Sequence, residues 1–174
     1  GSTTKNYFGY GTGRRYMFFD PLAVKVSYEH SVRLPIAREL LGNGTTIYAN
    51  VALKPEKSNN VNLALFGTWH PAGRHTIYYE ANGFLRYVDN YIQTSVIEKE
   101  GMMQFVNDPA VHIKGVEGEI RYDWDGRLQL MPNVSYQDAR DQQKYKEDGK
   151  PSATYDNHVP NRPWLFGNAE ASYT

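Results

Sequence analysis

The sequence predicts an all-β fold, an antiparallel meander of about six strands that forms a segment of a large transmembrane β-barrel. Apolar and polar residues alternate with a period of two, which is typical of strands with one apolar and one wet face. Short and long connections alternate along the chain. The 14 tyrosines among 174 residues point the same way, because tyrosine favours places where one side is apolar and the other wet.

The alternation defines six strands of about ten residues, the length of a tilted strand that crosses a bilayer. Between residues 128 and 136, Leu128, Leu130 and Val134 share one face, and Gln129 and Asn133 share the other. The polar face carries too many charges and amides to be buried, because burying such a group unpaired is costly. The same template fits residues 22–31, 60–69, 76–92, 111–122 and 164–173.

The connections distinguish two ends of the expected sheet. Those at 70–74 and 123–126 are short, and those at 32–59, 94–109 and 138–162 are long. Outer-membrane barrels have short periplasmic turns and long extracellular loops, so we expect strand 22–31 to run outward and strand 60–69 inward. Pro35 suits the start of a helix and Gly42 its end, which predicts one short helix from Pro35 to Leu41 in the first loop.

Composition excludes several functional classes. The 19 basic residues balance the 19 acidic ones, so no basic surface for nucleic acid is expected. No apolar run reaches the roughly 18 residues of a membrane-spanning helix. The absence of cysteine excludes disulfides, thiol catalysis and thiolate metal ligands.

We predict no enzyme, no metal site and no cofactor. The five histidines are scattered without metal-ligand spacing, and no G-x-S-x-G nucleophile motif occurs. The glycine-rich run at 9–13 follows no buried strand and opens no helix, which favours a loop or strand end over a phosphate-binding loop. Glu117 and Glu119 share a strand face, and they are expected to line a wet lumen rather than to form a catalytic pair.

Four pieces of the sequence, taken in order, resemble the C-terminal half of the TonB-dependent outer-membrane receptors. The first is a loop with R-L-P at 33–35, E-L-L-G at 39–42 and N-V-A-L-K-P-E at 50–56. It departs from the family pattern because Val51 stands where a proline usually follows the asparagine. The other three are Y-V-D-N-Y-I at 87–92, I-K-G-V-E-G-E at 113–119 and Y-Q-D-A-R at 136–140.

The resemblance covers about residues 22–174 and implies part of an active transporter in the outer membrane of a Gram-negative cell. Such receptors take up a scarce nutrient, a siderophore, vitamin or oligosaccharide, through a barrel surrounded by outer-membrane lipid. The resemblance implies that the plug domain, the N-terminal region through which the TonB complex acts and the final strands of the barrel lie outside this sequence. Haem is disfavoured, since the family's haem receptors carry a histidine between the two loop motifs and none lies between Arg33 and Leu53.

Two further expectations complete this interpretation. Gly1 and Ser2 are interpreted as a cloning scar, and residues 3–174 as a fragment of the receptor barrel. A soluble secreted or periplasmic antiparallel β-domain that binds glycan or protein would show the same alternation, so this alternative stays open.

Ligand-binding residues of such a receptor are expected on its long outward loops. Cationic and aromatic side chains there suit an anionic or sugar-like small molecule or glycan. The sequence offers three in the first loop and three in the last, namely Arg38, Tyr48, Lys54, Tyr155, His158 and Arg162.

Overall fold

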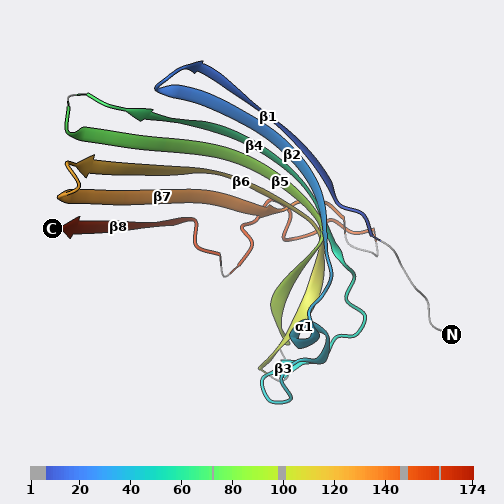
Figure 1. The fold of residues 1–174 in the computed structure, drawn as a ribbon. Helices are drawn as coiled ribbons and strands as arrows, with labels where there is room; N and C mark the ends of the chain where they lie inside the picture. Colours follow the sequence, from blue (N-terminus) through green and yellow to red (C-terminus); the bar gives the residue numbers. More distant parts are fainter. Residues whose placement is uncertain (1–6, 72, 98–100, 146–148, 161) are drawn as a thin grey trace.

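The computed structural model describes residues 7–71, 73–97, 101–145, 149–160 and 162–174, so the expected scar at Gly1 and Ser2 lies outside it. The described chain forms one eight-stranded sheet with a single short helix (Figure 1). None of its helices is long and apolar enough to cross a membrane. The elements are β1 (Tyr10–Phe19), β2 (Leu22–Arg33), α1 (Ala37–Leu41), β3 (Ile47–Tyr48), β4 (Glu56–Trp69), β5 (His75–Ile97), β6 (Met102–Trp124), β7 (Leu128–Asp141) and β8 (Leu165–Tyr173).

The sheet is an up-and-down meander in the order β1-β2-β4-β5-β6-β7-β8, with every neighbouring pair antiparallel. This confirms the predicted all-β antiparallel meander. Only β3 departs from the pattern, because it pairs in parallel with β6.

Strand β1 was not among the six expected strands. Its first residues belong to the glycine-rich run that we interpreted as a loop or strand end, and the structure places them in a strand. Gly11, Gly13 and the adjacent Arg14 and Arg15 interrupt the apolar alternation, so the period-two signal is weak there. The backbone nevertheless pairs with β2 from Tyr10 onward.

Strands β5 and β6 are each 23 residues long, and they overturn the predicted long loop at 94–109. Most of that segment continues the β5–β6 ladder, with Gln93 opposite Val106 and Ile97 opposite Met102. The periodic signal is lost there because both faces carry polar residues once the hairpin extends beyond the lipid. The expected short helix is present as α1, with Gly42 at its C-terminal cap in a positive-φ conformation.

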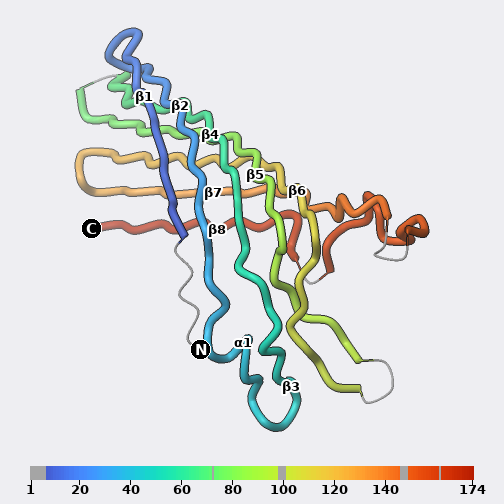
Figure 2. The backbone as a smooth tube through the Cα atoms, turned by 90° about the vertical axis from the view of Figure 1, so that its right-hand side faces the viewer, coloured from blue at the N-terminus to red at the C-terminus, as the bar shows by residue number. Residues whose placement is uncertain are grey.

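The two ends of the sheet differ. The turns that join β1 to β2, β4 to β5 and β6 to β7 gather at one end, which we call the turn end (Figure 1). The opposite end, the loop end, carries α1, β3, the extended tip of β5 and β6 and the chain between β7 and β8 (Figure 2). The long connections at 32–59 and 138–162 and the short turns opposite them agree with the expected alternation, whereas the expected connection at 94–109 is mostly strand.

The convex face of the sheet carries an apolar band. Cross-strand pairing places Val26 beside Leu63 and Val116 beside Tyr136, and these side chains are exposed in the isolated segment. On β5 the band runs from Ile77 to Tyr87, about 33 Å of strand or about 25 Å of bilayer depth at a tilt of about 40°. Aromatic side chains mark both borders, with Trp69, Tyr122, Trp124 and Tyr173 toward the turn end and Tyr10, Tyr28, Tyr87 and Tyr136 toward the loop end.

The concave face is polar over the same depth. Glu80 lies opposite Glu119, and Asn82 lies opposite Glu117. Toward the loop end this face becomes apolar, in a small core of Val88, Val111, Ile113, Ala139 and Val159. One face therefore suits lipid and the other a hydrated lumen, which is the pattern of a barrel wall.

Candidate functional site

The first long connection folds back onto the extended hairpin instead of hanging free. Asn107 of β6 holds Lys54 by its backbone, accepting from the amide at 2.8 Å and donating to the carbonyl at 3.0 Å. The Asn50 side chain donates to the Phe105 carbonyl at 2.8 Å, and β3 pairs with β6 beside it. Because these bonds join segments 50 or more residues apart, the connection is a fixed part of the loop end.

An ion cluster fixes the start of the same connection. The Arg33 guanidinium at the end of β2 contacts Glu39 of α1 at 3.0 Å and Glu56 of β4 at 2.5 Å. Glu39 is buried and also accepts from the Ile36 amide at 2.9 Å, and Glu56 accepts from the Ile92 amide at 2.6 Å. One arginine therefore ties the helix and three strands together.

The last long connection is fixed by a second ion cluster, centred on the buried carboxylate of Asp138 above the apolar band. Arg140 contacts it at 2.9 Å, His158 at 3.1 Å and Lys114 at 3.6 Å. Burial acts to raise the pKa of Asp138, but Arg140 and the other bases outweigh it and hold that pKa below its usual value. His158 pairs with Arg140 in a β-bridge, so the connection continues the sheet beside β7.

A cavity of about 360 Å³ lies between this connection and β7. Its lining includes Tyr136, Trp164, His158 and Arg162, which combine aromatic surface with basic groups. Tyr136 and Trp164 stand edge to face with ring centroids 6.3 Å apart. Aromatic surfaces with a few placed polar groups are the usual lining of small-molecule pockets.

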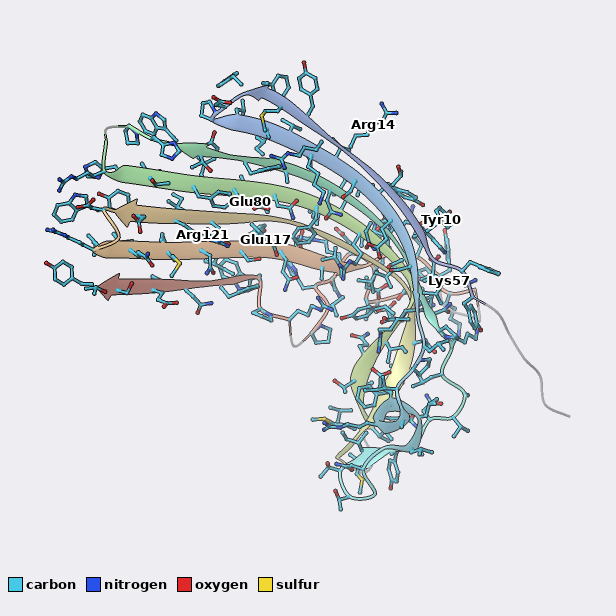
Figure 3. All side chains as sticks on the ribbon, viewed as in Figure 1. Tyr10, Arg14, Lys57, Glu80, Glu117 and Arg121 are labelled. Carbon is cyan, nitrogen blue, oxygen red and sulfur yellow. The ribbon has the colours of Figure 1, made fainter. Side chains whose placement is uncertain are left out.

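A second hollow, of about 240 Å³, lies on the concave face among carboxylates and amides. Glu80, Glu117 and Glu119 line it together with Asn133 and Ser135. Arg121 pairs with Glu119, and its guanidinium lies 5.3 Å from the centre of the Tyr78 ring (Figure 3). In the part of the chain that the structure describes, no group of three or more acidic or histidine side chains is placed to hold a metal ion.

The comparison with protein families decides what this wall belongs to. The model of the TonB-dependent receptor-like β-barrel matches residues 1–174. The chain belongs to this family. It is therefore a segment of an outer-membrane receptor barrel, and the soluble-domain alternative is set aside.

Solved structures show the same fold. A copper transporter, OprC, is 20% identical with a TM-score of 0.66 over 94% of this chain and 23% of its own. The iron transporter FrpB from Neisseria meningitidis is 17% identical, with a TM-score of 0.56 over 95% of this chain and 24% of its own. The hemophore receptor HasR from Serratia marcescens, solved with its hemophore and heme, is 17% identical with a TM-score of 0.59 over 95% and 27%. This chain thus spans about a quarter of their length, and no curated protein sequence matches it.

Within the receptor barrel, all six residues predicted to bind ligand lie at the loop end. Arg38 is exposed on α1, Tyr48 lies in β3, and Lys54 is exposed beside Asn107. These three lie on the connection that docks against β6.

The other three predicted residues lie on the last connection. Tyr155 stacks under Lys144, whose ammonium is 5.6 Å from the ring centre, and Arg162 donates to the Tyr91 hydroxyl at 2.8 Å. The cavity beside β7 brings His158 and Arg162 together, so these two share one pocket. The docking role of Asn107 was not predicted, since no local pattern marks an asparagine that binds a segment 53 residues away.

Proposed function

We propose that this segment forms part of the wall and the ligand-binding rim of an outer-membrane transporter for a scarce nutrient. The rim is the loop end, and it faces the cell exterior. The observation that carries the proposal is that both long connections are folded against the strands by ion clusters, each centred on a buried carboxylate. Such ordering is expected of loops that present a binding surface, because their side chains are then held in place before the ligand arrives.

Ligand chemistry of several kinds fits this rim. The structural neighbours are described as transporters of copper and iron and as a hemophore receptor, which supports uptake of a metal-containing or similarly scarce nutrient. Basic and aromatic side chains in the cavity beside β7 suit an anionic siderophore, a vitamin or an oligosaccharide. The energy for uptake would come from the TonB complex, acting on another part of the receptor. The proposed process is transport, with no covalent bond made or broken.

The test uses the full-length receptor with two separate triple-alanine variants. One replaces Arg38, Tyr48 and Lys54, and the other replaces Tyr155, His158 and Arg162. We expect either triple to reduce uptake of the receptor's nutrient at least tenfold while surface expression stays normal.

A third triple variant is the matched control. It replaces Asp125 and the two arginines that pair with it at the turn end, Arg74 and Arg127, and it should leave uptake unchanged. Normal uptake in both loop-end triples would contradict the proposed binding rim.

A further inference from the structure

Arg14 is placed where a barrel wall does not tolerate an unpaired charge. It lies in β1 opposite Val26, which in turn lies opposite Leu63, so it belongs to the apolar convex face. Its neighbour Arg15 lies on the concave face, with its guanidinium 4.7 Å from the centre of the Phe66 ring. Figure 3 shows Arg14 on the convex side together with Tyr10.

The depth of Arg14 is close to the middle of the band. On β1 the band runs from Phe18 near the turn end to Tyr10 near the loop end, and Arg14 lies four residues from each, about 13 Å along the strand. Lys114 of β6 lies opposite Leu85 at the loop-end border of the band, where it pairs with Asp138. The other convex positions of the described strands within the band hold aliphatic, aromatic, glycine and proline residues. Among the described residues, Arg14 is thus the one charge on the lipid-facing band that has no charged partner.

A guanidinium remains charged at any physiological pH, so it cannot escape this cost by losing a proton. A lipid-facing arginine at the bilayer midplane is strongly destabilising. No described residue compensates the charge of Arg14, since no hydrogen bond or ion pair joins it to any of them. A partner with negative charge must therefore come from outside the described chain.

The free edge of β1 shows where that partner lies. No described strand pairs with this edge, and an unpaired edge cannot persist in a bilayer, so another strand must pair there in the complete barrel. The side chain directly opposite Arg14 on that strand would lie about 5 Å away between Cβ atoms, and diagonal ones about 7–8 Å. A second copy packed through the described wall would bring no available carboxylate, because the one beside the band, Asp138, is buried and already paired with Arg140, His158 and Lys114.

We propose that the strand bonded to the free edge of β1 carries an aspartate or glutamate on its lipid-facing side, opposite or diagonal to Arg14, and that the two form an ion pair within the bilayer. The pair closes the barrel at this position and fixes the register of that strand against β1. The ion pair is needed to specify the register of β1, since Gly11 and Gly13 give this strand little side-chain packing.

The sign of a stability change tests the proposal. The full-length receptor is refolded into vesicles of neutral lipid and unfolded with urea. Removing a lipid-exposed charge raises the midpoint of unfolding, whereas removing one partner of a buried pair lowers it. We expect Arg14→Leu to lower the midpoint, and Val26→Leu, at the adjacent position on β2, to leave it nearly unchanged.

A double variant covers the case in which Arg14→Leu fails to assemble. In this variant Arg14 and the acidic residue beside it on the neighbouring strand are both replaced by leucine. Assembly and the urea midpoint should then recover, because neither charge is left unpaired. The proposal is overturned by any of three results: a raised or unchanged midpoint in Arg14→Leu, no recovery in the double variant, or no acidic residue at those positions of the neighbouring strand. An effect of Arg14→Leu that requires anionic lipid would instead identify a lipid headgroup as the partner.

Discussion

The side-chain amide nitrogen of Gln93 donates a hydrogen bond of 3.2 Å to Oδ2 of Asp108, while Oε1 of Gln93 and Oδ1 of Asp108 are both buried without a partner among the described residues. The two residues lie on β5 and β6 in the extended hairpin, about 25 Å beyond the last band residue of β6, Val116, at 3.3 Å per residue. One proton on Oδ1 of Asp108 would let that oxygen donate to the Gln93 carbonyl. Both unpartnered oxygens would then be satisfied at once.

This pair predicts a pH dependence of stability. Burial, and next the nearby Asp141 carboxylate, raise the pKa of Asp108 from 3.8 to about 6. The folded state therefore binds this proton more tightly than the unfolded state. The stabilisation is full below about pH 4 and is lost as the pH rises through about 6. We expect a contribution of about 1–2 kcal/mol.

Urea unfolding of the full-length receptor at pH 5 and pH 8 measures this contribution. Asp108→Asn should remove it, because the asparagine amide donates to Gln93 at every pH. Asp89→Asn, at an exposed carboxylate of β5, should keep the wild-type dependence. An identical pH dependence in the wild type and in Asp108→Asn would refute this assignment.

The strength of the local pattern decided what the sequence could predict. Strand β7 was predicted well because its alternate residues face different environments and differ in polarity. Leu128, Leu130 and Val134 face lipid, and Gln129 and Asn133 face water. Strand β1 and the outer half of the β5–β6 hairpin lack that contrast, either because glycine and arginine interrupt it or because both faces lie in water. Their pairing comes from neighbouring strands rather than from their own residues.

For the predicted site, too, the sequence revealed local features but not long-range contacts. Loops rich in basic and aromatic residues could be recognised locally, so Arg38 and His158 were placed at the correct end of the sheet. The contacts that order these loops join residues far apart in the sequence. Arg33 and Glu56 are 23 positions apart, and no spacing rule marks such a pair in a single sequence.

The two faces of the wall predict opposite tolerance to charge. Val134 lies on the convex band, and 53% of its surface is exposed in the isolated segment, whereas its neighbour Asn133 lies on the concave side. Val134→Arg should cost up to about 2–4 kcal/mol, the cost of a charge at the bilayer midplane, and Asn133→Arg should cost little. Assembly yield and urea midpoint of the full-length receptor measure both. Equal tolerance at the two positions would mean that the faces are misassigned.

A close approach at Gly115 predicts intolerance to any side chain there. A Cβ atom at Gly115 would meet the ring of Phe84 and would lie 2.5 Å from the Tyr136 carbonyl oxygen. Gly115→Ala should therefore destabilise the barrel by about 1–3 kcal/mol through overpacking. Gly118→Ala is the control, since the nearest atom there is 3.8 Å away. Similar urea midpoints for the two variants would show that the wall has more room than the structure describes.

Removal of the ion cluster at Arg33 is predicted to release the first loop from the strands. Arg33→Ala leaves the carboxylates of Glu39 and Glu56 without their cation, at an expected cost of about 1–3 kcal/mol. Proteolysis within residues 34–55 of the assembled receptor should become faster. Arg38→Ala, which removes an exposed arginine from the same loop, should leave the cutting rate as it is. A rate unaffected by Arg33→Ala would mean that Asn107 and β3 hold the loop without the cluster.

The central claim is that this segment crosses the outer membrane with its loop end outside. The segment contains no cysteine, so a single cysteine introduced into it can report its orientation once any cysteine elsewhere in the full-length receptor is replaced by serine. Thr154→Cys lies at the loop end and Arg74→Cys at the turn end, both at exposed positions. A membrane-impermeant maleimide added to intact cells should label Thr154→Cys, and it should label Arg74→Cys only after the outer membrane is permeabilised. Labelling of Arg74→Cys in intact cells, with Thr154→Cys protected, would contradict the account.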